Sequence, residues 1–139
     1  MMVSLAELHR LCTAAAKASG ASGLVARSLA DATVAAEAEG QKTVGVAHFF
    51  DYLDAFRAGR IDPMAMPVLK RVKPAIFHSD AMGGIAQLGF DRAFKRYVAA
   101  VKKHGLALFT QSNAWTCGSL GYHAERLAAE GLVALAATN

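Results

Sequence analysis

Residues 105–139 read GLALFTQS (105–112), NAWTCGSLGY (113–122) and, after a helical stretch, GLVALAATN (131–139). An apolar run, a glycine-punctuated polar loop, an amphipathic helix and a second apolar run follow one another, which predicts a parallel βαβ unit. Its strands are expected at 106–110 and 132–138, joined by a right-handed crossover. Ligands of open α/β sheets bind where loops leave the carboxyl ends of strands, so the 113–122 loop is the first candidate site.

The predicted βαβ unit also raises the question of what completes its sheet. A parallel sheet needs several strands and cover on both faces. The second apolar run closes the sequence, so nothing after it extends the sheet. We therefore expect the N-terminal part of a longer protein, or one half of an obligate assembly. The structure should then show an open apolar sheet face or a large interface.

Upstream of this unit, the sequence predicts a group of helices. Ser4 and Glu7 form a capping box for a first helix that Gly20 ends. A second helix is expected over about 22–39, because apolar residues recur there at helical spacing. A third passes through Phe49, Phe50, Leu53 and Phe56, and Gly59 ends it.

The pattern changes at about Pro63. Short strands are expected over 68–72 and 75–79, followed by a long helix over 87–104. The predicted division is an N-terminal helical section, residues 1–62, and a partial α/β cofactor and substrate domain, residues 63–139. The fold class is α/β, with a mixed sheet that contains the βαβ unit.

Composition limits the function classes. The chain has 139 residues, of which 54% are hydrophobic and 19% charged, and this is a globular composition. The net charge of +4 is mild and forms no long basic run, which disfavours nucleic acid as a partner. Cys12 and Cys117 lie far apart, so a reducing, cytoplasmic location fits better than a disulfide framework. We expect no signal peptide, no membrane-spanning segment and no metal site.

Three segments together resemble the malate/L-lactate dehydrogenase-like family of NAD(P)-dependent oxidoreductases, which is distinct from the Rossmann lactate dehydrogenases. They are EAEGQKTVGVAHFFDYL (37–53) with RAGRID (57–62), the turn at 80–87, and residues 105–139. The family also includes reductases of pyrroline- and piperideine-2-carboxylate. The resemblance implies a three-layer fold, a homodimer, and NAD or NADP held largely by segments that follow Asn139.

The sequence departs from the family pattern at chemically important positions. The family usually has Ser-His-Gly where this chain has Thr43-Val44-Gly45, and Arg where it has His48. In the loop, the position of the family's catalytic acid/base His falls on Thr116. Four other positions match the family: Tyr52, Gly118, Leu120 and Gly121. The resemblance therefore implies a divergent subgroup.

His48, Tyr52 and Thr43 are the candidate catalytic residues of the helical section. His48 and Tyr52 lie four residues apart on one helix face, where an imidazole could exchange a proton with a substrate oxygen. The alternative is a surface or cap-region histidine. Thr43 either supplies the hydroxyl that Ser supplies in relatives or caps the coming helix.

In the loop, Thr116 could hydrogen-bond a substrate oxygen but cannot act as an acid/base, because its hydroxyl does not titrate in the useful range. Trp115 either shields a nicotinamide or packs in the core, and Cys117 reads as a packing residue. Backbone N–H groups at the start of a helix suit a phosphate or carboxylate. The candidate cofactor-binding residues are Gly118, Ser119, Leu120, Gly121 and Asn139.

The leading hypothesis is hydride transfer between NAD(P) and a small 2-hydroxy or 2-oxo acid, or the C=N bond of a cyclic imino acid. The alternative is a catalytically inert partial domain. A helical-front interaction module is a third hypothesis, which needs an exposed apolar patch. The sequence also predicts that His48 and the 113–121 loop face one pocket, within one subunit or across a dimer.

Overall fold

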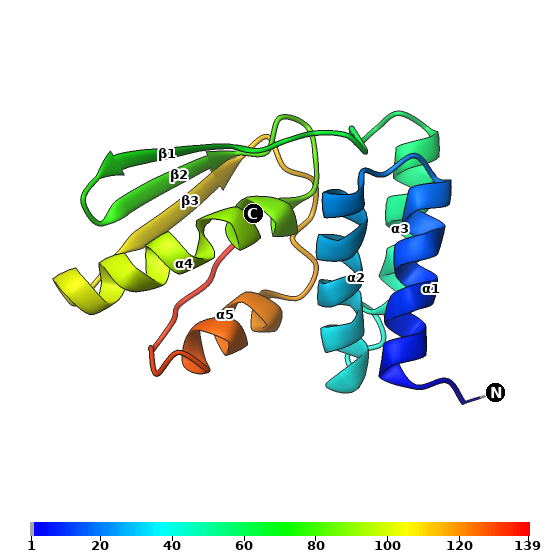
Figure 1. The fold of residues 1–139 in the computed structure, drawn as a ribbon, viewed down its shortest axis with the longest axis horizontal. Coiled ribbons are helices and arrows are strands. Elements are labelled where there is room, and N and C mark those ends of the chain that lie inside the picture. Colours follow the sequence, from blue (N-terminus) through cyan, green and yellow to red (C-terminus); the bar gives the residue numbers. More distant parts are fainter. Residues whose placement is uncertain (1) are drawn as a thin grey trace.

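A computed structural model describes residues 2–139 and shows helices first, then a mixed sheet with further helices (Figure 1). The elements are α1 (Leu5–Ala18), α2 (Gly23–Ala38), α3 (Val46–Arg57), β1 (Val68–Lys73), β2 (Ile76–Asp80), α4 (Ala86–His104), β3 (Leu108–Ser112) and α5 (Leu120–Ala128). The predicted fold class is confirmed. The division into domains at residues 62 and 63 stays a prediction. Among residues 2–139, no helix is both long and apolar enough to cross a membrane.

The helical section forms as its capping residues predict. Ser4 Oγ accepts a hydrogen bond from Glu7 N, and Ser22 Oγ accepts one from Val25 N. Gly20, with φ of +99°, follows the end of α1. Alanines without exposed surface let the three helices approach closely, and larger side chains fill the core between them. Those larger core residues include Val25, Leu29, Phe49, Leu53 and Ile61.

The start of α3 is held by a side chain from α2. Gly45 is the N-cap and has no side chain, so Glu37 Oε1 accepts the hydrogen bond from Val46 N at 2.7 Å. A Cβ at Gly45 would overlap the Glu37 side chain, so a larger residue there would push the carboxylate away from Val46 N. The contact fixes where α3 begins, and with it the place of His48 in the first turn. Thr43 lies exposed in the preceding turn, so its alternative role as a helix cap is wrong.

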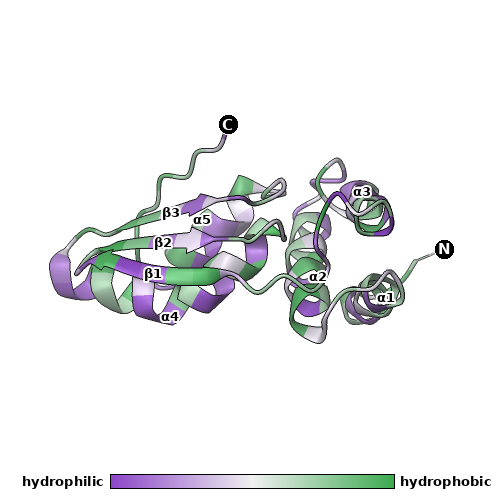
Figure 2. Ribbon diagram, turned by 90° about the horizontal axis from the view of Figure 1, so that it is seen from above, coloured by the Kyte–Doolittle hydropathy of each residue, from purple (hydrophilic) through white to green (hydrophobic). Residues whose placement is uncertain are grey.

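The sheet has the order β1-β2-β3 (Figure 2). β1 and β2 are antiparallel, with an irregularity between Arg71 and Lys73. β2 and β3 are parallel, with Phe77 opposite Phe109, and α4 connects them. The parallel βαβ unit of this chain is therefore β2–α4–β3, one unit earlier in the sequence than expected.

The second strand of the predicted unit at 105–139 is absent, so that prediction is wrong. β3 begins at Leu108, and residues 132–139 form an extended tail without strand pairing. Side-chain burial still alternates along the tail. Leu132 and Ala134 pack on a cluster around Phe90 and Leu127, while Val133 and Leu135 are fully exposed. An extended segment becomes a strand only when a neighbour completes its hydrogen bonds, and the tail has none.

The face of the sheet that points away from α4 is open, as expected, but only partly apolar. Exposed Val68, Val72 and Leu108 lie on this face. Between them, the imidazole of His78 bridges the hydroxyls of Thr110 and Ser112, with distances of 2.9 and 3.1 Å. The open face is therefore amphipathic.

Asp91 of α4 joins three helices. It accepts hydrogen bonds from Ser28 of α2 and from Arg126 of α5. The Arg126 guanidinium also lies over the Phe94 ring, 4.4 Å from its centroid, and within reach of the Phe90 and Tyr122 rings. This junction fixes α5, and therefore the loop before it, against the rest of the molecule.

Candidate functional site

The loop between β3 and α5, residues 113–119, is anchored first at Asn113. This residue has φ of +52°, and its Nδ2 donates to both carboxylate oxygens of Asp80 at 3.1 Å. The Met82 N–H and then the Asn113 amide lower the pKa of Asp80, because both hydrogen bonds favour the carboxylate. Trp115 N donates to Gly84 O, so the loop is tied to the turn after β2.

Tyr52 of α3 holds the middle of the loop. Its hydroxyl donates to Thr116 O at 2.7 Å and accepts from Gln87 Nε2 at 2.9 Å. Tyr52 is 2% exposed, and burial raises its pKa to about 12. The phenol therefore stays protonated near neutral pH and serves as a donor to the backbone.

His48 reaches the loop through Trp115. The two rings stack with centroids 6.2 Å apart, and Tyr52 packs edge-on against both. His48 Nδ1 lies 2.9 Å from Asp51 Oδ2. The structure thus brings the candidates His48, Tyr52 and Thr116 together around the indole.

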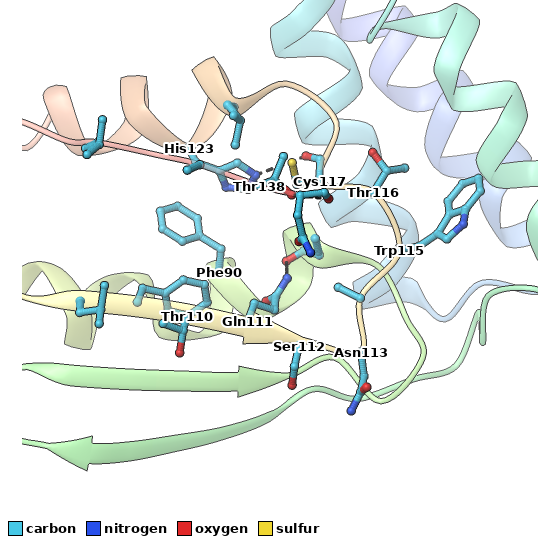
Figure 3. Close-up of a pocket in the computed structure, with 18 of the residues that line it drawn as sticks. Phe90, Thr110, Gln111, Ser112, Asn113, Trp115, Thr116, Cys117, His123 and Thr138 are labelled. Atoms are coloured by element: carbon cyan, nitrogen blue, oxygen red, sulfur yellow. Dashed lines mark hydrogen bonds between the residues drawn. The ribbon is translucent and has the colours of Figure 1, made fainter.

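A groove of about 820 Å³ runs along β3 and past the loop (Figure 3). Residues 113–117 close one end, and all of β3 forms one side. Phe90 and Tyr97 of α4 and the tail residues Leu135, Ala137, Thr138 and Asn139 form other walls. Thr116, Leu120 and Asn139 of the predicted site residues line this groove, whereas His48 and Tyr52 lie behind the loop.

His123 of α5 also lines the groove, although the sequence alone favoured a structural or solvent role for this residue. Its Nε2 donates to Cys117 O at 3.3 Å, and its ring packs edge-on against Phe90. Burial lowers the pKa of His123, so the imidazole is neutral near pH 7. The signal was present, because Leu120, His123 and Leu127 follow helical spacing and all three line the groove.

The predicted cofactor-binding glycines pack against their own chain. A Cβ at Gly118, where φ is +67°, would come within 3.2 Å of Gln87 Nε2. Ser119 is the N-cap of α5, but its hydroxyl donates to Gln41 Oε1 at 2.8 Å. Thr116 Oγ1 accepts from Gly118 N at 3.3 Å. Side chains from α3, α4 and α5 thus fix the loop, which fits a preorganised site.

The groove nevertheless suits a nicotinamide nucleotide in size and character. Its volume lies within the usual range for small-molecule sites, about 300–1,000 Å³. Phe90 and Tyr97 give the groove an aromatic wall, whereas the indole of Trp115 stacks on His48 and the Asn113 amide is bound to Asp80. An aromatic wall fits a planar ring such as a nicotinamide.

The sequence and the fold both match known proteins. The chain is 29% identical over 136 residues to Δ1-pyrroline-2-carboxylate reductase 2 of Burkholderia multivorans, covering 98% of this chain and 40% of that protein. It is 31% identical to the (2R)-3-sulfolactate dehydrogenase (NADP(+)) of Chromohalobacter salexigens, covering 99% of this chain and 41% of that protein. The structure of Δ1-piperideine-2-carboxylate reductase from Pseudomonas syringae superposes with a TM-score of 0.91 at 26% identity, covering 94% and 40% of the two chains.

The chain thus spans about 40% of the length of the curated relatives it matches. The family model for malate/L-lactate dehydrogenase matches residues 3–139, which is nearly the whole chain. The chain belongs to the malate/L-lactate dehydrogenase family of NAD(P)-dependent oxidoreductases.

Proposed function

We propose that the chain is the loop-bearing portion of an NAD(P)H-dependent reductase of cyclic 2-imino acids, of the Δ1-pyrroline-2-carboxylate class. One observation carries the proposal. Thr116 stands where the resemblance places an acid/base imidazole, and both its carbonyl and its hydroxyl hold the loop.

A 2-oxo acid and a cyclic imine differ in whether the enzyme has to supply a proton when hydride is added. Hydride addition to a 2-oxo acid leaves an alkoxide, which needs a proton donor in the site. A cyclic imine can enter as the protonated iminium. Hydride then forms the new C2–H bond, the C=N π pair becomes the nitrogen lone pair, and a neutral amine results.

The groups around the loop fit a substrate that brings its own proton. Tyr52 is buried, with a pKa of about 12, and burial lowers the pKa of His123. Both are therefore neutral, and neither is a strong acid near pH 7. Imine reductases among the similar proteins support the same substrate class. The similarity to sulfolactate dehydrogenase supports oxidation of a 2-hydroxy acid as the alternative function.

NAD(P)H would supply the hydride, and the chain's own residues would orient the reactants. In this proposal Trp115, Asn113 and Asn139 contact the nicotinamide end of the cofactor. His48 and Thr43 contact the substrate, and a homodimer completes the enzyme.

Substrate preference tests the proposal. The protein as expressed from its own gene should reduce Δ1-pyrroline-2-carboxylate with a kcat/KM at least about 10²-fold above that for pyruvate, because only the imine avoids the alkoxide. Preference for the 2-oxo acid would overturn the proposed substrate class.

Cofactor binding has a separate readout, because Trp115 is the only tryptophan of the chain. Titration with NADPH or NADH should quench Trp115 emission by energy transfer. The Trp115→Phe variant, titrated in parallel by calorimetry, separates loss of signal from loss of binding. Absence of binding by the protein as expressed from its gene would remove NAD(P)H from the proposal.

A further inference from the structure

The imidazole of His48 is held on three sides. Its ring stacks on the Trp115 indole with centroids 6.2 Å apart, and the Tyr52 ring packs edge-on against it at 5.1 Å. Asp51, three residues further along α3, brings its Oδ2 to 2.9 Å from His48 Nδ1. Tyr52 is fixed in turn, because its hydroxyl donates to Thr116 O. The surrounding chain therefore sets the plane and the rotation of the imidazole.

The contact with Asp51 decides which ring nitrogen of His48 carries the proton. A carboxylate only accepts hydrogen bonds, so Nδ1 donates, and the neutral imidazole carries its proton there. Nε2 then holds the lone pair and is a hydrogen-bond acceptor. Among residues 2–139, no group forms a hydrogen bond with His48 Nε2. The His48 side chain is 21% exposed, so the ring is not sealed inside the core.

An acceptor on this ring distinguishes the two substrate classes. A protonated cyclic imine presents an N–H donor, to which a lone pair is complementary. A 2-oxo acid presents a keto oxygen, which itself accepts hydrogen bonds. Two acceptors that face each other leave both groups without a hydrogen bond, and such a mismatch discriminates strongly between substrates.

We propose that Asp51 is a positioning residue that sets substrate specificity: it holds His48 in the Nδ1–H form, so that Nε2 accepts the N–H of a protonated cyclic imine. This inference rests on the proposed function, which gives His48 a contact with the substrate. Asp51 is 63% exposed and acts only through His48. Hydride adds to C2, the C=N π pair becomes the nitrogen lone pair, and the N–H proton stays on the nitrogen. No proton moves to or from His48 in this step.

The tautomer of His48 has a spectroscopic readout that does not depend on activity. In the protein as expressed from its own gene, carrying isotope-labelled histidine, the neutral His48 ring should show the nitrogen shifts of the Nδ1–H form. The signal that is missing from His48→Gln assigns the ring. Asp51→Asn and Asp51→Ala should shift it toward the Nε2–H form, because an imidazole without an acceptor at Nδ1 prefers that tautomer. Asp51→Glu keeps a carboxylate and should retain Nδ1–H.

Substrate preference supplies the functional readout. Asp51→Asn should lower kcat/KM for Δ1-pyrroline-2-carboxylate about 10-fold or more, as expected for one lost hydrogen bond, and lower that for pyruvate much less. Asp51→Glu should retain the preference for the imine. Asp54→Asn is the matched control, because Asp54 is also exposed on α3 and pairs with Arg57, three residues further on. It should change neither the tautomer nor the preference. Exposed ion pairs add little stability, so all these variants should keep the Tm.

Two results would overturn this inference alone. A neutral His48 ring in the Nε2–H form in the unsubstituted protein, or an Nδ1–H form that survives both Asp51→Asn and Asp51→Ala, would mean that Asp51 does not set the tautomer. A preference for the imine that persists after the tautomer has changed would mean that His48 Nε2 does not meet the substrate's N–H. Preference of the unsubstituted protein for pyruvate would instead overturn the proposed function, and with it the specificity given to Asp51.

Discussion

The Tyr52 hydroxyl shows what one buried side chain does for the loop. It donates to Thr116 O and accepts from Gln87 Nε2, and so joins α3, the loop and α4. We expect Tyr52→Phe to lower the free energy of unfolding by about 1–3 kcal/mol, because the buried Gln87 amide and the Thr116 carbonyl each lose a hydrogen bond. Urea unfolding measures this, and Tyr97→Phe, whose hydroxyl bonds a single carbonyl, is the comparison. A loss below that of Tyr97→Phe would contradict the role given to Tyr52.

Tyr52 and Tyr122 should both make the free energy of unfolding depend on pH in the alkaline range. Burial raises the pKa of each to about 12, above the ordinary value near 10. A raised pKa gives stability that is present below pH 10 and lost as pH rises from about 10 to 12. Tyr52→Phe should therefore flatten the fall in stability over this window without removing it. Unfolding curves at several pH values check this, and an unchanged slope would rule out the contribution.

Two imidazoles lie near the loop, and substitution separates them. His48→Ala should lower kcat/KM about 10²-fold or more, in the protein as expressed from its gene, if His48 supplies the proton. A smaller loss is expected if the iminium brings its own proton, as proposed above. His123→Ala should act mainly through the Cys117 carbonyl that it holds. Steady-state kinetics with the imine substrate measures both variants, and His104→Ala, at the exposed end of α4, is the control. An unchanged rate with intact folding would remove His48 from the mechanism.

At the level of elements, the contact of α4 with the sheet depends on Gly89. A Cβ there would overlap Gln111 Oε1 and Ser79 Oγ, which lie between the helix and the strands. We expect Gly89→Ala to destabilise by about 1–3 kcal/mol, since the core cannot accept the added volume. Gly23→Ala in the first turn of α2, where the nearest atom is a Lys17 carbon at 4.0 Å, should be neutral or slightly stabilising. Thermal unfolding of both variants gives the comparison, and equal Tm values would contradict the argument.

The helices and strands also show which parts of the fold the sequence alone can predict. Helices α1 to α4 were predictable, because caps and apolar spacing are local properties. The absence of a strand at 132–138 was not predictable from the sequence. Alternation of buried and exposed residues indicates only an extended chain, and a strand also needs a neighbour to pair with. In the site, Tyr52 and Thr116 were found by resemblance. The capping role of Glu37 and the hydrogen bond from Gln87 join residues far apart in sequence, so no local pattern encodes them.

At the scale of the molecule, Asp91 couples the helical section to α5. Its carboxylate is partly buried and binds both Ser28 and Arg126. We expect Asp91→Ala to cost about 1.5–3 kcal/mol, because Arg126 loses its charged partner among three aromatic rings. Asp54→Ala, which breaks an exposed pair with Arg57, should cost under about 1 kcal/mol. Urea unfolding compares them, and hydrogen exchange in α5 should accelerate only for Asp91→Ala.

The β2–α4–β3 crossover has a consequence for the order of folding. The β1–β2 hairpin and the α1–α2 pair join segments close in sequence, so their loop-closure entropy is small. Pairing of Phe77 with Phe109 has to wait until α4 spans the distance between them, which makes it a slower, non-local event. The loop at 113–119 takes its place only after β3 has docked. Trp115 emission should therefore report the last step of refolding, later than the helical signal in circular dichroism.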